Sequence, residues 1–153
     1  MINKKGFTVV EILVVVVILA VVGLIIMMSV IPRIEQNAKE SFVNDGKLYL
    51  QAATKYFSDT AISDESFSGG CISIDELNKN DVGVIDKKNY SGYIIVNKSE
   101  ENEVTYQIVI TNKRFYTYNR LDNTYLVSSD EFESEAVLDN FGNVKDFPTK
   151  CPE

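Results

Sequence analysis

The stretch KKGFTVVEILVVVVILAVVGLIIMMSV, residues 4–30, decides the fold of this chain. No charged side chain occurs over residues 12–31, which are almost entirely aliphatic. A helix of about 20 apolar residues covers roughly 30 Å, the thickness of a bilayer core. Lys4 and Lys5 precede the run, so the positive-inside rule places the N-terminus in the cytoplasm and the rest of the chain outside.

A removable secretory signal fits this stretch poorly. The apolar run exceeds the usual core of about 7–15 residues, and its exit, MMSVIPRIEQ, offers no small-x-small cleavage site. An uncleaved signal anchor, followed by a surface domain that binds a ligand or partner protein, remains an alternative.

Glu11 is the unusual residue, because a carboxylate lies at the start of an apolar span. An acidic residue at the centre of such a helix costs about 2.5–3.5 kcal/mol, and less towards the interface, so an ionisable residue here indicates a function and requires a partner. Cleavage between Gly6 and Phe7 would create an α-amino group four residues before Glu11. That amine could pair with the carboxylate of its own chain or of a neighbouring copy.

The order Lys4-Lys5-Gly6, then Phe7-Thr8-Val9-Val10-Glu11 and a long apolar helix, resembles the class III signal of type IV prepilins. The related pseudopilins of type II secretion and DNA uptake share it. The resemblance implies that a prepilin peptidase cuts after Gly6, that Phe7 becomes the N-methylated first residue, and that Glu11 neutralises the Phe7 amine of an adjacent subunit during assembly.

The resemblance also implies a function and partners. The chain would be a structural pilin that waits in the membrane as a single-pass protein and then self-assembles into an extracellular type IV pilus-like filament. An assembly platform and an ATPase motor would drive that assembly. A minor pilin or a pseudopilin of a secretion or DNA-uptake system is the alternative within the family. Adhesion, motility, DNA uptake and protein secretion share this subunit plan, so the sequence does not choose among them.

The remainder predicts an α+β fold, in which a long N-terminal helix packs on a small antiparallel sheet, as in type IV pilins. The expected parts are a leader (residues 1–6), a transmembrane and filament-core helix (7–32), an amphipathic helix (33–57) and a globular region (58–153). Within the last part we expect a loop, a short helix that a capping box at Ser73 starts, an antiparallel meander and a C-terminal region.

The amphipathic half of the helix is predicted from apolar residues at helical spacing, which should pack on the globular region. They are Ile34, Ala38, Phe42, Tyr49, Ala53 and Phe57, with Leu48, Ala52 and Tyr56 alongside. Four segments with a period of two or high strand propensity predict the strands: residues 93–97, 104–111, 115–118 and 125–127. Turns are expected at Asn112-Lys113 and at Leu121-Asp122-Asn123.

Composition excludes several functions. The chain has no His, which excludes His-based acid–base catalysis and His-ligated zinc. No Ser or Cys with a base and no phosphate-binding loop is present, so we expect no enzyme and no cofactor. The net charge of −7 argues against a nucleic-acid partner.

The two cysteines and one acidic run each allow two interpretations. Cys71 and Cys151 lack metal-site spacing, so a disulfide in an oxidising compartment is predicted, with two unpaired buried thiols as the alternative. The acidic run Asp130, Glu131, Glu133 and Glu135 lacks an EF-hand pattern, and we expect a solvated loop and no metal, although a calcium site like that of major pseudopilins is conceivable.

Overall fold

The computed structural model describes residues 8–60, 67–79, 89–99, 101, 103–139, 144 and 147–152. The chain divides into two compact units, Met1–Ala38 and Lys39–Glu153, and each is described by itself. Gly6 and Phe7, on which the predicted cleavage falls, lie outside the described residues.

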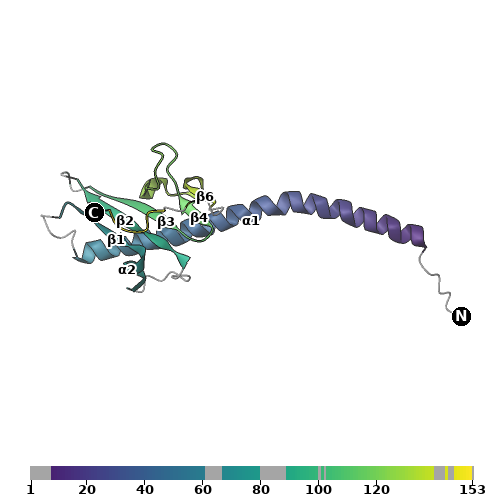
Figure 1. The fold of residues 1–153 in the computed structure, drawn as a ribbon, viewed down its shortest axis with the longest axis horizontal. Coiled ribbons are helices and arrows are strands. Elements are labelled where there is room, and N and C mark those ends of the chain that lie inside the picture. Colours follow the sequence, from purple (N-terminus) through teal and green to yellow (C-terminus); the bar gives the residue numbers. More distant parts are fainter. Residues whose placement is uncertain are drawn as a thin grey trace. The chain divides into compact units, whose positions relative to one another are not determined.

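A single helix, α1 (Val9–Thr60), contributes residues to both units (Figure 1). Pro32 lies inside this helix and does not end it. A proline removes one backbone hydrogen bond, and the remaining i to i−4 bonds of the flanking turns keep the helix continuous. The predicted long N-terminal helix is confirmed.

In the second unit, α1 buries one stripe of side chains against the sheet. The buried residues are Phe42, Val43, Tyr49, Leu50, Ala53 and Phe57. Each large apolar side chain buried in this way stabilises the fold by roughly 1.5–3 kcal/mol. The prediction is confirmed for four of them, while Leu48 is wrong, since 39% of its surface is exposed. Ile34 and Ala38 belong to the first unit. Val43 and Leu50 widen the stripe beyond the predicted positions.

The sheet is antiparallel, in the order β1-β2-β3-β4-β6, with β5 paired to β3. Its strands are β1 (Gly69–Ser73), β2 (Ser91–Lys98), β3 (Val104–Thr111), β4 (Phe115–Thr117), β5 (Val127–Ser128) and β6 (Val137–Asp139). The short helix α2 (Ile74–Lys79) follows β1, and Ser73 caps it by accepting a hydrogen bond from the Glu76 backbone at 3.2 Å. The α+β class and the predicted helix start are confirmed.

Sequence reasoning missed the two edge strands. β1 begins at Gly69, inside the segment predicted as a loop, and β6 is only three residues long. Two consecutive glycines argue against a strand, and three residues are too few to show a period of two. The β1 backbone forms a strand here because it pairs with β2 over five residues.

Strands β4 and β5 lie along the same side of β3, because β2 occupies its other side. Between them the chain leaves the sheet in an excursion over residues 118–126, with a bridge between Asn119 and Thr124. Buried Thr117 fixes the base of this excursion: its hydroxyl donates to the Tyr125 carbonyl at 2.8 Å and accepts from the Ile110 backbone at 3.1 Å. The predicted turn at residues 121–123 is its tip.

Gly46 is a packing position on α1. A Cβ added there would lie 2.5 Å from Cζ of Phe132, a side chain that is fully buried. A ring can approach the helix this closely only where the helix carries no side chain, so Gly46 lets the segment after β5 pack onto α1.

Tyr90 joins the sheet to α1 through a polar contact in the core. Its hydroxyl donates to Oδ2 of Asp45 at 2.6 Å, and its ring packs 5.8 Å from those of Phe42 and Tyr49. Burial, followed by the hydrogen bond and the charge of Asp45, raises the pKa of the Tyr90 phenol well above its usual value. The neutral phenol is therefore the form that the fold stabilises.

This pKa predicts a loss of stability in alkali. Because the folded-state pKa is raised, the contribution is fully present below the unfolded value of about 10 and is lost as the pH rises above it. One such tyrosine lowers the free energy of unfolding by up to about 1.4 kcal/mol per pH unit in that range. Denaturant unfolding in micelles at pH 9–11 should show a shallower decline for Tyr90→Phe. The decline should not vanish, since burial also raises the pKa of Tyr93 and of Tyr116. An unchanged slope contradicts the assignment.

Candidate functional site

The N-terminus of α1 carries a reciprocal cap built by Thr8 and Glu11. The Thr8 hydroxyl accepts a hydrogen bond from the Glu11 backbone at 3.2 Å, and Oε2 of Glu11 accepts one from the Thr8 backbone at 3.4 Å. This is the capping-box arrangement, in which a Thr and a Glu three residues later satisfy two backbone donors that a helix end leaves unpaired.

The cap gives the Glu11 carboxylate a partner within its own chain. An acid in the first turn of a helix is stabilised by the unpaired amides there and by the helix dipole, typically by about 0.3–1 kcal/mol. This stabilisation is smaller than the free-energy cost of placing a carboxylate deep in a bilayer, so the cap offsets only part of that cost. A positively charged partner would offset more of it.

Sequence reasoning did not identify Thr8 as a functional residue. The signal was present, because Thr8-Val9-Val10-Glu11 has the T-x-x-E spacing of a capping box immediately before an apolar run. The structure brings Thr8 and Glu11 together. Their relation to Gly6 and Phe7 is not described, because those two residues lie outside the described part of the chain.

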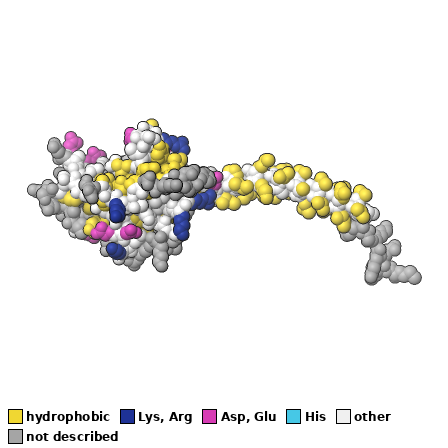
Figure 2. Space-filling model, in the orientation of Figure 1, with side chains coloured by type: hydrophobic (Ala, Val, Ile, Leu, Met, Phe, Trp, Pro, Cys, Tyr) yellow, Lys and Arg dark blue, Asp and Glu magenta, His cyan; other side chains and the backbone are white. Residues whose placement is uncertain are grey.

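The first unit presents an apolar surface around the whole helix. The aliphatic side chains over residues 9–31 are exposed, and Figure 2 shows hydrophobic side chains along this part of α1. Among the described residues one helix, Val9–Asp59, is long and apolar enough to cross a membrane, with a mean hydropathy of 3.4 in its most apolar window and none of that window buried. In water such a surface would be strongly unfavourable, so its length and composition indicate a membrane anchor.

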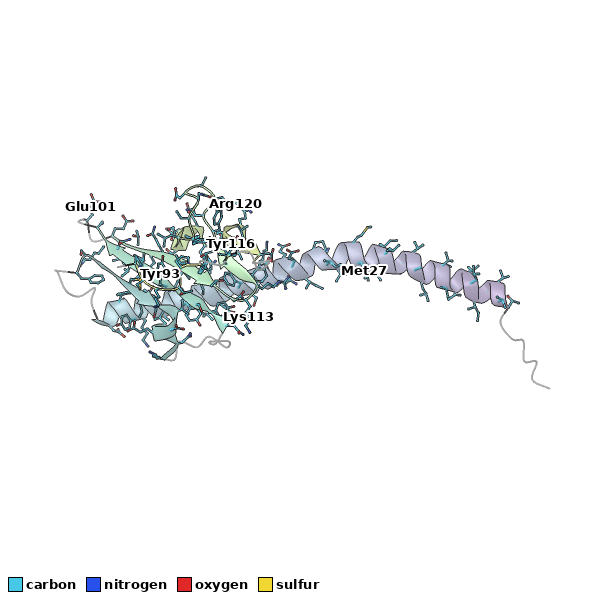
Figure 3. The ribbon with its side chains drawn as sticks, viewed as in Figure 1. Met27, Tyr93, Glu101, Lys113, Tyr116 and Arg120 are labelled. Atoms are coloured by element: carbon cyan, nitrogen blue, oxygen red, sulfur yellow. A yellow bond between two sulfur atoms is a disulfide. The ribbon has the colours of Figure 1, made fainter. Side chains whose placement is uncertain are left out.

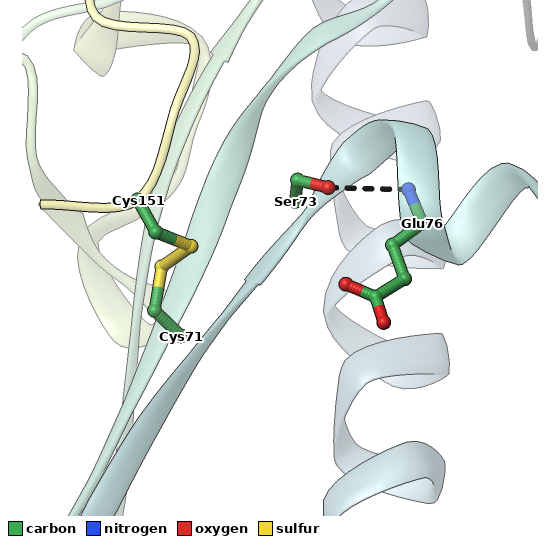
Figure 4. Close-up of a disulfide and its surroundings, with 4 residues drawn as sticks. All are labelled: Cys71, Ser73, Glu76 and Cys151. Atoms are coloured by element: carbon green, nitrogen blue, oxygen red, sulfur yellow. Dashed lines mark hydrogen bonds between the residues drawn. A yellow bond between two sulfur atoms is a disulfide. The ribbon is translucent and has the colours of Figure 1, made fainter. Parts of the chain in front are cut away.

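Cys71 and Cys151 form a disulfide, with their Cα atoms 5.9 Å apart and 80 positions apart in the sequence (Figure 4). Cys71 lies in the middle of β1, and Cys151 lies in the last described segment. The bond therefore joins the C-terminal end of the chain to an edge strand.

The acidic run after β5 lies in two short 3-10 helices, η2 (Ser129–Glu131) and η3 (Ser134–Ala136), and in the link between them, where Glu133 is the N-cap of η3. All four acidic residues are exposed. In the part of the chain that the structure describes, no group of three or more Asp, Glu or Cys side chains is placed to hold a metal ion.

Residues 1–27 match the family described as the prokaryotic N-terminal methylation motif. Comparison with curated proteins and with solved structures finds no match. The matched segment contains Gly6, Phe7 and the Thr8–Glu11 cap, and it extends through most of the apolar span. Over residues 1–27 the chain therefore carries the N-terminal methylation signal that is typical of type IV pilins and pseudopilins.

Proposed function

We propose that this chain is a structural subunit of a type IV pilus-like filament, assembled through α1 after removal of residues 1–6. The observation that carries the proposal is the methylation motif at the start of α1, whose apolar side chains over residues 9–31 are exposed. A helix that is apolar on all sides is suited to lipid before assembly and to packing among other apolar helices afterwards.

Glu11 has a defined role in this proposal. Cleavage after Gly6 frees the amine of Phe7, which a prepilin peptidase system then methylates. In the membrane the Glu11 carboxylate accepts the hydrogen bond from the Thr8 backbone nitrogen, at 3.4 Å. In the filament it pairs with the Phe7 amine of an adjacent subunit, and because that pair is a charged one in a dry helix bundle, it fixes the register of neighbouring helices.

The proposed pilin function also implies a membrane topology and a set of partner proteins. The N-terminus lies in the cytoplasm with Lys4 and Lys5, and the second unit lies outside the membrane. Cleavage removes both lysines, so no basic side chain remains before Arg33. Prepilin peptidase, an assembly platform and an ATPase motor supply the chemistry and the work of assembly.

Mass spectrometry of the mature N-terminus tests the proposal. The chain is expressed with its prepilin peptidase, and the membrane fraction and the sheared surface fraction are analysed. We expect both to contain chains that begin with N-methyl-Phe7, and a Gly6→Val variant to retain Met1 because the cleavage position is blocked. An intact Met1 in the unmodified chain would falsify the pilin assignment and favour an uncleaved signal anchor.

A further inference from the structure

The sheet of the second unit has two apolar faces, and α1 covers only one of them. Ile108 faces α1, since its Cδ1 lies 3.7 Å from the Cβ position of Gly46. Side chains alternate along a strand, so Val109 points to the opposite face, as does Tyr93, its neighbour on β2. Val109 is nevertheless fully buried and Tyr93 is 8% exposed. Something other than α1 covers this outer face.

Residues 147–152, here called the C-terminal strap, cross that face. At one end the Phe147 ring lies 5.0 Å from the ring of Tyr125 and 6.3 Å from that of Tyr116 on β4. At the other end Cys151 is bonded to Cys71 on β1. Since β2 and β3 lie between β4 and β1, the strap passes over both.

The pairing register of the strands places residues 147–152 over the buried pair Tyr93 and Val109. Tyr116 lies beside Thr111, and Cys71 lies in the row of Ile95 and Gln107. Between the rows of positions 111 and 107 lies the row that contains Tyr93 and Val109. Figure 3 labels Tyr93 and Tyr116, which mark the covered strip and the aromatic end of the strap.

The strap has few attachments. Among the described residues no hydrogen bond joins residues 147–152 to the sheet, so the disulfide, the aromatic contacts of Phe147 and the packing over Tyr93 and Val109 hold it. The crossing covers three strand spacings, about 14 Å, and four residues along the strands, about 13 Å, which makes a diagonal of roughly 20 Å. Four extended residues, about 14 Å, together with the 5.9 Å between the bonded Cα atoms reach roughly the same distance, so the strap has little slack. Ordering a segment of this kind has an entropic cost that one aromatic side chain does not offset.

We propose that the Cys71–Cys151 disulfide is a redox-controlled closure of the strap over the outer face of the sheet. Both cysteines are half-buried rather than enclosed in the core, so the bond lies near the surface, where a reductant is expected to act. The proposal rests on the topology given above, so the reductant is a dithiol that acts on the outer side of the membrane. This dithiol supplies two electrons and two protons: the S–S bond breaks, two Cys thiols form, and the reductant becomes a disulfide. The strap then leaves the sheet, and the strip at Tyr93 and Val109 becomes exposed, while the core between α1 and the sheet stays folded.

Hydroxyl-radical footprinting of the full chain in detergent micelles tests this proposal, because it measures the exposure of individual side chains. In a Cys71→Ser/Cys151→Ser variant, the oxidation rates of Tyr93 and Phe147 should rise at least about threefold, since both lose their cover. The rate of Tyr49, which is fully buried on α1, should not change. Reduction of the unmodified chain should reproduce these rates, and reoxidation should restore the original ones.

Two variants serve as controls. Cys151→Ser alone should match the double variant, because the bond that holds the strap needs both cysteines. Phe147→Leu with the disulfide intact should keep Tyr93 protected, because the bond still holds the other end. Unchanged rates at Tyr93 and Phe147 after loss of the bond would overturn the proposal. A rise at Tyr49 as well would also overturn it, because the bond would then support the whole unit and not the strap alone.

Discussion

Glu11→Gln is expected to be cleaved and methylated normally but to lower the yield of sheared filaments at least about tenfold. Glutamine occupies the same volume and can still accept the Thr8 backbone hydrogen bond, so the helix cap is retained. It carries no charge, and in the proposed filament it would therefore leave the methylated Phe7 amine of the neighbouring subunit without a counter-charge. Removing one partner of a buried ion pair costs about 3–5 kcal/mol, and each 1.4 kcal/mol corresponds to a factor of ten. Filaments are quantified by immunoblot of the sheared fraction against the membrane pool.

Thr8→Val is the matched control for that experiment. It removes the hydroxyl that accepts the Glu11 backbone hydrogen bond at 3.2 Å and keeps the carboxylate. Losing an N-cap side chain costs about 0.5–2 kcal/mol, so its effect on filament yield should be smaller than that of Glu11→Gln. If the valine variant loses its filaments and the glutamine variant keeps them, the essential role of Glu11 is to start the helix, and the proposed pairing between subunits is wrong.

The sequence was sufficient for the elements that have strong periodicity. The helix through Pro32 and strand β3 follow from long apolar or alternating patterns, and the structure has both where the pattern places them. The turn at Asn112 was also predictable: its side chain accepts backbone hydrogen bonds from Arg114 at 2.8 Å and from Phe115 at 2.6 Å. Local chemistry of this kind acts over three or four residues and is visible in a single sequence.

Features that depend on tertiary contacts were not predictable in this way. Gly46 counts against a helix by propensity, yet it is required there because Phe132, more than 80 positions later, packs on it. The strap and the outer apolar face likewise depend on which strands lie between β1 and β4, which periodicity does not specify. At the functional site the opposite holds, since the T-x-x-E spacing that links Thr8 to Glu11 was legible in the sequence.

Gly92→Ala is expected to destabilise the second unit by at least about 3 kcal/mol, among the larger effects of a single substitution. Gly92 has a φ of +140°, a backbone conformation that residues with a Cβ rarely adopt. An added Cβ would overlap the carbonyl oxygen of Val109 and lie 2.9 Å from its carbonyl carbon. Because that backbone belongs to β3, relief requires β2 and β3 to separate where they pair, and this breaks ladder hydrogen bonds in the centre of the sheet.

Thermal unfolding of the full chain in micelles measures this effect through the near-ultraviolet circular dichroism of its eight tyrosines, all of which lie in the second unit. The matched control is Gly23→Ala on α1, where an added Cβ would meet nothing within 4 Å and alanine is the better helix former. We expect Gly23→Ala to leave the tyrosine transition unchanged and Gly92→Ala to lower its midpoint by at least about 10 °C. Equal midpoints for the two variants would mean that β2 and β3 do not approach each other at Gly92 as closely as described. The close pairing of these central strands, on which both faces of the sheet depend, would then be wrong.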